Sequence, residues 1–298
     1  MNILGRLFLS LGYRGKLKVI PDELYLRILY RVRTGKKLNL KSPKSFNEKL
    51  QWLKLNYRKP IQTQMVDKYE VKDYVKSLIG DEFVIPTIGV WDTFEEIDFE
   101  SLPDSFVLKC THDSGGLVIC KDKSQLDWNS VGRRIKRSLK KNYYWNSREW
   151  PYKNVQPRIM MEPYLVDETA NSMGLKQLPV YKFFCFSGNP YMIQTIQNDK
   201  LPDESIDYFN CNWEWLNLRQ NHPNSKNRMP APERLAEMVK IAEKLSQGFP
   251  FIRVDLYQVN GKVFFSEYTF YSDSGLAAFS PDKWDSELGE MIVLEAGL

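Results

Sequence analysis

Residues 251–269 contain two short β-type segments around a turn dipeptide: Phe251-Ile-Arg-Val-Asp-Leu-Tyr-Gln-Val259, then Asn260-Gly261, then Lys262-Val-Phe-Phe-Ser-Glu-Tyr-Thr269. Alternating residues on either side of Asn-Gly predict a β-hairpin. The first strand carries Arg253 and Asp255, and the second carries Glu267. An Asp and a Glu on adjacent strands can hold Mg²⁺ against a triphosphate, because Mg²⁺ takes carboxylate oxygens together with substrate phosphates. The alternative is a surface hairpin with a salt bridge.

The register of this hairpin decides whether the two carboxylates meet. Cross-strand partners share a face, so a slip of one residue moves a side chain to the other face. A two-residue loop would pair Val259 with Lys262 and place Asp255 opposite Ser266. A three-residue loop would place Asp255 opposite Glu267 instead. The metal-site interpretation therefore predicts an odd-length loop with a G1-type bulge.

The composition is typical of one large or two modest globular domains. The chain has 298 residues, 43% of them hydrophobic, and a net charge of +5. This mild basic excess suits a phosphate-rich ligand and argues against a nucleic-acid partner. Four cysteines without Cys-x-x-Cys spacing and two histidines do not predict a zinc site. No apolar run is long enough to cross a membrane, and a cytoplasmic location is expected.

Apolar periodicity predicts that residues 1–58 are largely helical. The first twelve residues either pack against the domain, which we expect, or lie on a membrane surface as a peripheral contact. The other expected elements are a helix over 64–78, strands over 84–90 and 105–110, a basic helix over 127–142, a hairpin over 180–197 and a long loop over 198–230.

Four features that suit a nucleotide follow one another in the sequence. Lys68 lies in a predicted helix, Lys109 ends a strand before a Gly-containing loop, Glu162 ends a later strand, and the 251–269 hairpin closes the set. Lysines and backbone N–H groups neutralise phosphates, and a carboxylate pair can hold the metal that bridges them. Each feature alone is weak, because a lysine on a helix or at a strand end is often only a solvated side chain.

This order resembles the ATP-grasp superfamily, and within it the branch of TupA-like proteins found with bacterial surface-polysaccharide pathways. The resemblance covers roughly residues 40 to 295. It is carried by Ser45-Phe-Asn-Glu-Lys-Leu-Gln-Trp-Leu-Lys54, Asp67-Lys-Tyr-Glu-Val71, Leu108-Lys-Cys-Thr-His112, Pro157-Arg-Ile159 with Glu162, Arg253-Val-Asp-Leu-Tyr257 and Glu267-Tyr-Thr-Phe270.

The resemblance implies an α/β (α+β) ATP-grasp-like fold, with a helical N-terminal extension over residues 1–63 and a catalytic domain over 64–298. Two sub-lobes of that domain with antiparallel sheets, about 64–165 and 166–298, would clamp ATP. It implies that Asp255 and Glu267 hold Mg²⁺ and that Arg253 stabilises the transferred phosphoryl group. Superfamily members usually carry Asn two residues after the second metal carboxylate, and here that residue is Thr269, a weaker metal ligand.

The resemblance also implies the residues that bind the nucleotide. Lys68 and Lys109 would bind phosphates, with Lys109 also acting in catalysis, and Lys182 would be a further phosphate contact. Either Asp167 or Glu168 would hold the ribose. The loop that covers the phosphates and the hinge strand beside adenine would consist of Ser114, Gly115, Gly116, Glu162, Tyr164 and Leu165.

The reaction that the resemblance implies is an ATP-dependent carboxylate–amine ligation through an acyl phosphate. The expected partners are ATP and a saccharide or amino-acid acceptor, either free or carried on a nucleotide or a lipid. Three alternatives stay open: a sugar kinase, a metal-dependent glycosyltransferase and a non-catalytic scaffold. The role of His112 is open as well, between a structural hydrogen bond and catalysis.

Overall fold

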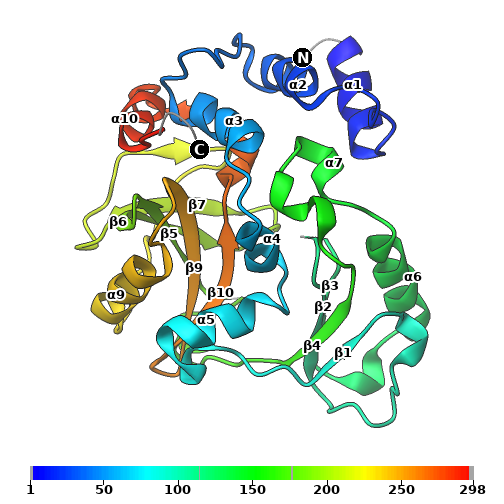
Figure 1. Cartoon of the computed structure of the whole chain (residues 1–298). Coiled ribbons are helices and arrows are strands. Elements are labelled where there is room, and N and C mark those ends of the chain that lie inside the picture. Colours follow the sequence, from blue (N-terminus) through cyan, green and yellow to red (C-terminus); the bar gives the residue numbers. More distant parts are fainter. Residues whose placement is uncertain (1–2, 114, 176, 295–298) are drawn as a thin grey trace. The chain divides into compact units, whose positions relative to one another are not determined.

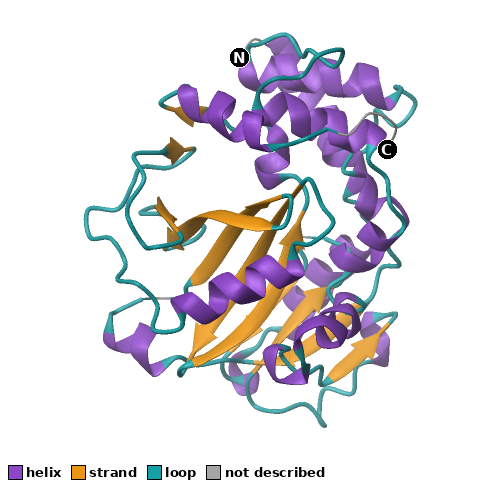
Figure 2. Ribbon diagram, turned by 60° about the vertical axis from the view of Figure 1, so that its left-hand side comes forward, coloured by secondary structure: helices purple, strands orange, loops and turns teal. Residues whose placement is uncertain are grey.

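The computed structural model describes residues 3–113, 115–175 and 177–294. The chain divides into two compact units. The first comprises residues 1–58, 145–149 and 167–298, and the second comprises residues 59–144 and 150–166. The chain passes from the second unit to the first after Val166, one residue beyond the expected sub-lobe boundary. Figures 1 and 2 show a layered arrangement of helices and antiparallel sheets within the units, as the sequence predicts.

The first unit is built on a five-stranded antiparallel sheet in the order β10-β9-β5-β6-β7. Two of its connections are tight turns with positive φ, Ser187-Gly188 and Asn260-Gly261, a conformation that suits a hairpin between twisted strands. The predicted hairpins at 180–197 and 251–269 are therefore confirmed. The strands are β5 Val180–Phe186, β6 Asn189–Gln197, β7 Ser205–Asn210, β9 Phe251–Val259 and β10 Lys262–Thr269.

The two faces of this sheet have different covers. Helix α9 (Leu235–Leu245) lies across one face, as Figure 2 shows, and the thiol of Cys185 on β5 points to the carbonyl of Ala242 there. On the opposite face Phe46 of α3 (Phe46–Asn56) packs edge-on against Phe251, with ring centroids 4.9 Å apart. Successive strand residues alternate between the two faces of a sheet. The residues of β9 that lie two or four positions after Phe251 therefore point to the same face as Phe251, away from α9.

The N-terminal helices and the C-terminal helix complete the first unit. A capping box fixes the start of α3, in which Ser45 and Glu48 each bind the other's backbone N–H. None of the described helices is both long and apolar enough to cross a membrane. The remaining elements of this unit are α1 Ile3–Tyr13, α2 Asp22–Thr34, α8 Glu168–Ser172, α10 Lys283–Met291 and the two-stranded sheet of β8 Arg219–Gln220 with β11 Phe279–Ser280.

The second unit is built on a four-stranded antiparallel sheet in the order β1-β4-β2-β3. Its core joins the sheet to α6 through apolar side chains such as Phe106, Leu108 and Ile135. The strands are β1 Gly89–Trp91, β2 Phe106–Cys110, β3 Leu117–Cys120 and β4 Ile159–Pro163, and the helices are α4 Ile61–Val66, α5 Val71–Ile79 and α6 Trp128–Leu139; α7 Tyr144–Ser147 joins this unit to the first.

Three predicted elements differ from the structure. The helix over 64–78 is broken between α4 and α5, because the Asp67 carboxylate accepts the N–H groups of Tyr69 and Glu70 and forms a turn. Of the predicted strand 84–90 only residues 89 and 90 belong to a strand, β1, which continues to Trp91, because that is where β4 offers a partner. The expected loop 198–230 contains β7 and β8; pairing with β6 and β11 overrides the polar composition.

Helix α10 approaches α3 so closely that a glycine is required at its contact. A Cβ atom on Gly289 would lie 2.3 Å from the Lys44 carbonyl oxygen and 2.7 Å from the Phe46 nitrogen. We predict that Gly289→Ala lowers the free energy of unfolding by about 1–3 kcal/mol in urea denaturation, although Gly→Ala inside a helix normally stabilises it. Ser286→Ala at an exposed position of the same helix is the control, and an equal loss there would contradict this explanation.

Candidate functional site

Asp255 and Glu267 are cross-strand partners in the hairpin of β9 and β10. The loop is the two-residue Asn260-Gly261, with Val259 paired to Lys262, so the predicted odd-length loop is wrong. A bulge at Ser266, between Phe265 and Glu267, shifts the register by one residue instead. The extra residue within the strand brings the two carboxylates onto one face.

Arg253 and Asp255 form a bidentate pair on β9. The Arg253 Nε and Nη2 atoms each donate to one carboxylate oxygen of Asp255 at 2.7 Å. Both side chains are buried, and Asp255 is only 1% exposed. Burial raises the pKa of the Asp255 carboxyl, and the Arg253 guanidinium opposes that rise. Residues two apart on a strand share a face, which is what allows the fork to form.

Lys182 and Ser272 extend this group on either side. Lys182 on β5 pairs across the ladder with Asp255 and holds its Nζ atom 3.9 Å from the Asp255 Oδ2 atom. The Arg253 Nη1 atom donates to the Ser272 hydroxyl at 3.4 Å, and its Nη2 atom lies 3.9 Å from Glu267. All of these strand residues lie on the face away from α9. The structure therefore brings together four predicted site residues, Lys182, Arg253, Asp255 and Glu267.

The loop that follows β10 is held by buried polar side chains that the sequence prediction missed. Gln51 donates to the carbonyls of Ser274 and Gly275 at 2.9 and 2.8 Å, and Lys54 donates to that of Ser274 at 2.8 Å. Ser274 in turn donates its hydroxyl to Glu149 at 2.6 Å. Burial lowers the pKa of Lys54 to about 8. Gln51 and Lys54 belong to the 45–54 motif, whose polar residues inside an apolar helix were the available signal.

In the second unit the Glu162 carboxylate on β4 forms ion pairs with two lysines. The Lys109 Nζ atom lies 2.5 Å from one carboxylate oxygen, and the Lys72 Nζ atom lies 2.7 Å from the other. Burial alone would raise the pKa of Glu162, but the two lysines bring it below its ordinary value. Lys72 was missed, although it follows Lys68 by four residues, the spacing of one helical face. Glu162 thus has a side-chain role as well as its place on the predicted hinge strand.

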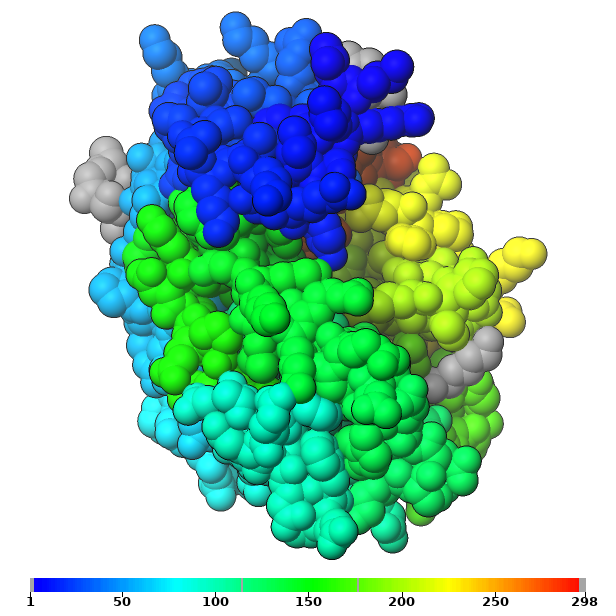
Figure 3. Space-filling view, turned by 90° about the vertical axis from the view of Figure 1, so that its right-hand side faces the viewer, coloured from blue at the N-terminus to red at the C-terminus, as the bar shows by residue number. Residues whose placement is uncertain are grey.

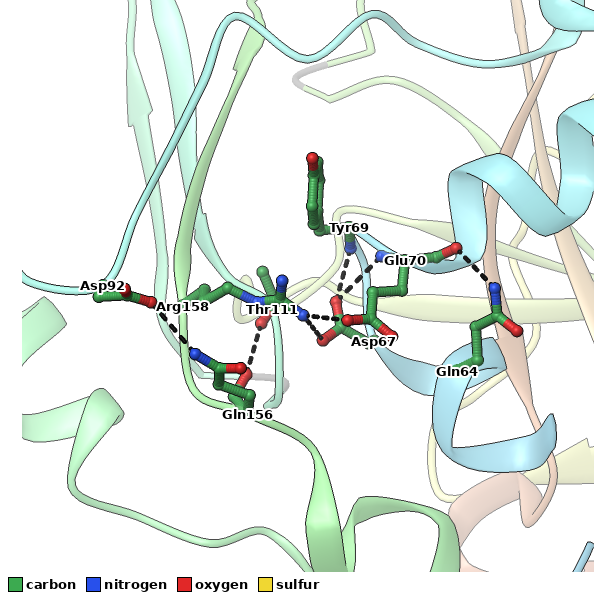
Figure 4. A network of polar contacts seen from close by, with 8 residues as sticks. All are labelled: Gln64, Asp67, Tyr69, Glu70, Asp92, Thr111, Gln156 and Arg158. Atoms are coloured by element: carbon green, nitrogen blue, oxygen red, sulfur yellow. Dashed lines mark hydrogen bonds and ion pairs between the residues drawn. The ribbon is translucent and has the colours of Figure 1, made fainter. Parts of the chain in front are cut away.

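Three separate motifs of this unit meet in one polar network, which Figure 4 shows. The Arg158 Nη2 atom contacts Asp67 at 3.1 Å and Glu70 at 2.5 Å. The backbone N–H of Thr111 donates to the Arg158 carbonyl, and that of Lys68 donates to the Thr111 carbonyl. This network fixes the turn that carries Lys68 beside the end of β2.

The loop after β2 is closed by polar contacts of Asp113. Its carboxylate accepts the N–H of Gly116 and the hydroxyl of Ser138, and its carbonyl accepts the ammonium of Lys68. Gly116 has a steric reason to be glycine, since a Cβ atom there would lie 2.4 Å from the Cys110 sulfur. Ser114 lies outside the described residues. Lys68 therefore contacts the loop that contains Gly115 and Gly116.

The predicted hinge and ribose residues follow β4. Tyr164 and Leu165 are partly buried beyond the end of the strand, and the Lys121 ammonium lies 5.8 Å from the centre of the Tyr164 ring. The buried carboxylate of Asp167 caps α8 by accepting the N–H groups of Thr169 and Ala170. The side chain of Glu168 is exposed.

The sequence matches a known family over most of its length. The model of the "TupA-like ATPgrasp" family matches residues 48–293. The chain belongs to the TupA-like ATP-grasp family. The resemblance inferred from the motifs is thereby confirmed. A search of curated proteins found no match.

Solved structures with a related fold are ATP-grasp ligases. The D-alanine–D-alanine ligase from Helicobacter pylori is 17% identical, with a TM-score of 0.41, and the match covers 77% of this chain and 61% of that one. The D-alanine–D-alanine ligase from Bacillus anthracis complexed with ATP is 14% identical, with a TM-score of 0.41, and the match covers 78% of this chain and 58% of that one. The ATP-grasp ligase PsnB, complexed with a minimal precursor, Mg and ADP, is 10% identical, with a TM-score of 0.37, and the match covers 75% of this chain and 57% of that one. The chain thus spans about three fifths of these proteins.

The donor set of the first unit in this TupA-like protein suits Mg²⁺. Mg²⁺ is usually held by one or two carboxylates together with substrate phosphates and water, not by an all-protein cage. Asp255 and Glu267 supply two such carboxylates on one face. Among the described residues no group of three or more His, Cys, Asp or Glu side chains could hold a metal.

His112 is buried in the second unit, and its Nε2 atom lies 3.1 Å from the Ser138 carbonyl oxygen. Burial lowers the pKa of His112 below the ordinary 6.5. As the pH falls, the imidazole is therefore protonated in the unfolded chain before it is protonated in the folded chain. The stability that neutral His112 contributes is complete above pH 6.5 and is lost as the pH falls from 6.5 toward the lower pKa of the folded state.

We predict that His112→Gln, which keeps a donor for Ser138 but cannot titrate, reduces the loss of unfolding free energy between pH 7.5 and 5.5. Urea denaturation at several pH values measures this. Turnover near pH 8 should be retained. A variant that folds normally but has no activity there would instead assign His112 to catalysis.

Proposed function

We propose that the protein is an ATP-dependent carboxylate–amine ligase. A carboxylate oxygen of the substrate attacks the γ-phosphorus of ATP, the bond to the bridging oxygen breaks, and ADP leaves. The amine nitrogen then attacks the carbonyl carbon of the acyl phosphate, phosphate leaves with the C–O electrons, and the nitrogen loses a proton. The products are an amide, ADP and phosphate.

In the first unit, the charged face of the sheet supplies the groups that handle the transferred phosphoryl group. Asp255 and Glu267 would hold Mg²⁺, which when bound neutralises phosphate charge. The Arg253 guanidinium has five N–H donors, and those on Nη1 and Nη2 that its pair with Asp255 does not use would bind the oxygens of the transferred phosphoryl group. Lys182 would add a further cation to a phosphate. The burial of Arg253 and Asp255 strengthens their interactions, because few water molecules compete.

In the second unit, Lys109 and Lys68 would bind phosphates, and the backbone of the loop containing Ser114, Gly115 and Gly116 would cover them. The loop lies against Lys68 through the Asp113 carbonyl, which supports that role. Glu162, Tyr164 and Leu165 would form the segment beside adenine, and Glu162 also holds Lys109 in place. For the ribose, the exposed Glu168 is favoured over Asp167, whose carboxylate is occupied in capping α8.

The family supports a role in bacterial surface-polysaccharide (capsule) biosynthesis. The substrates would be a saccharide or amino acid with a free carboxylate and an amine acceptor, either of which could be carried on a nucleotide or a lipid. Such carriers place the reaction in the cytoplasm and at the inner face of the membrane.

The observation that carries the proposal is the cross-strand pairing of Asp255 with Glu267, with Arg253 beside Asp255. It occurs on a chain that matches the family over residues 48–293. A glycosyltransferase needs a metal carboxylate pair but has no need for paired phosphate-binding lysines. A sugar kinase would use the same ATP site and differ only in its acceptor.

Hydroxylamine separates these reactions, because it traps acyl phosphates as hydroxamates. We predict that incubation with ATP, Mg²⁺, hydroxylamine and a panel of uronic and amino acids yields ADP and at least one hydroxamate, detected by mass spectrometry. Asp255→Asn should abolish both products. A stable phosphorylated sugar would replace the ligase with a kinase, a glycoside from a nucleotide sugar would replace it with a glycosyltransferase, and the absence of any product would favour a scaffold.

Arg253 offers a sharper test of the phosphoryl-transfer role. Arg253→Lys keeps the positive charge but loses the planar fork. We predict that kcat falls by about a hundredfold or more, the effect of removing one preorganised donor at developing charge, whereas the Kd for ATP with Mg²⁺ changes by less than about tenfold. Isothermal titration and steady-state assays measure the two. Arg234→Lys at an exposed position is the matched control, and equal losses in kcat and affinity for Arg253→Lys would contradict the assignment.

A further inference from the structure

Positive charge is concentrated before the cap of α3. Residues 1–44 contain eleven lysines and arginines and two acidic residues, a net charge of +9. The rest of the chain carries −4, because the total is +5. A mildly basic protein thus has a strongly basic N-terminal segment and an acidic remainder. Such asymmetry indicates an anionic partner for that segment.

Helix α1 is anchored along one stripe and exposes apolar side chains beside it. The Phe8 and Tyr25 rings have centroids 5.1 Å apart, and Gly12 lies so close to Tyr25 that a Cβ atom would meet the hydroxyl at 2.4 Å. The adjoining part of the helix surface presents Ile3, Leu4 and Leu7, which are 84%, 74% and 53% exposed. Their spacing puts them on one face of the helix, so the packing of α1 leaves this apolar face uncovered.

Arg148 anchors α2, against which α1 packs. The guanidinium of Arg148 stacks on the Tyr25 ring at 4.1 Å, donates to the Leu17 carbonyl at 2.8 Å and pairs with Asp22 at 3.2 Å. These contacts hold the start of α2 and the segment that connects it to α1. The N-terminal segment, blue in Figure 3, forms a continuous part of the surface shown there.

A pocket lies beside the exposed apolar face. It has a volume of about 1270 Å³ and is lined by both apolar and basic side chains. Arg31, Arg33 and Lys37 line it and are exposed, and of the described residues that line it none is acidic. Apolar side chains from α1 and α2, including Leu4, Phe8, Ile28 and Val32, form the rest. The lining therefore suits a ligand with an anionic head and an apolar body.

We propose that this N-terminal surface docks the protein on a bilayer of anionic phospholipids. Ile3, Leu4 and Leu7 enter the boundary between headgroups and acyl chains, and a phosphate headgroup lies in the pocket against Arg31, Arg33 and Lys37. An amphipathic helix with basic neighbours binds in this way, through buried apolar area together with attraction to anionic lipid. This surface is separate from the residues assigned to ligation above.

Other partners fit the same surface less well. A second copy of the chain would place two segments of charge +9 against each other, which is unfavourable. A nucleic acid would satisfy the arginines, but its hydrated phosphate backbone offers no environment for Ile3 and Leu4. Only a bilayer supplies anionic headgroups and apolar chains next to each other.

Vesicle sedimentation tests the proposal. The full-length protein should sediment with phosphatidylcholine vesicles that contain phosphatidylglycerol, should stay in solution with phosphatidylcholine alone, and should be released by salt. Arg31→Gln, Arg33→Gln and Lys37→Gln together should lower the partition coefficient about a hundredfold, since each basic residue near an anionic surface contributes roughly fivefold. Leu4→Ser with Leu7→Ser should weaken binding at unchanged charge.

The matched control is the triple variant Lys226→Gln, Lys240→Gln and Lys244→Gln, which removes the same charge from exposed positions of the first unit. It should change the partition coefficient by less than about threefold, and an equal loss would overturn the proposal. Failure to sediment with anionic vesicles would also overturn it. So would competition by duplex DNA as strong as that by lipid, if Leu4→Ser with Leu7→Ser had no effect. A dimer formed through this face in analytical ultracentrifugation would overturn it as well. Hydroxamate formation with free substrates should persist in all variants, so this result and that of the ligase test are independent.

Discussion

A buried carboxylate needs a cationic partner, and the pairing of Asp255 with Arg253 meets this need in the first unit. An unpaired charge in such a position would cost several kcal/mol. Strand β9 lies between β5 and β10, so the pair is covered from both sides. Lys182 comes from one neighbour, Glu267 from the other, and Ser272 from the loop beyond. The sheet thereby gathers four charged side chains on the face opposite α9.

The second unit solves the same problem with a different set of residues. Glu162 lies on β4, between β1 and β2, and its two oxygens are shared by Lys72 and Lys109. The lysines approach from a helix and from the adjacent strand, so the carboxylate ties α5 to the sheet. A charged cluster of this kind holds the ammonium groups in a defined place, and pre-organised cations are what a phosphate-binding surface requires.

Several other buried polar side chains hold backbone segments in place. Gln51, Lys54 and Glu149 hold the loop after β10, and Arg158 holds the turn that carries Lys68. Gln51, Lys54 and Arg158 lie in the motifs by which the family is recognised, yet they act on carbonyls and carboxylates of the chain itself. A family motif therefore contains positioning residues together with residues that face the ligand. Arg148 holds the start of α2 and the segment before it in a comparable way.

Local patterns by themselves determined the hairpins, and the motifs together determined the family. The roles of Asp255, Glu267, Arg253, Lys109 and Lys68, which the family resemblance implies, stay predictions. Turn dipeptides, period-two alternation and capping residues act over a few positions and can be read from sequence. Only the tertiary structure decided the bulge at Ser266, the break of the 64–78 helix at Asp67 and the pairing of β7. It also decided the placement of Lys72 and Lys54. These features depend on partners that lie far away in the sequence, so no local pattern specifies them.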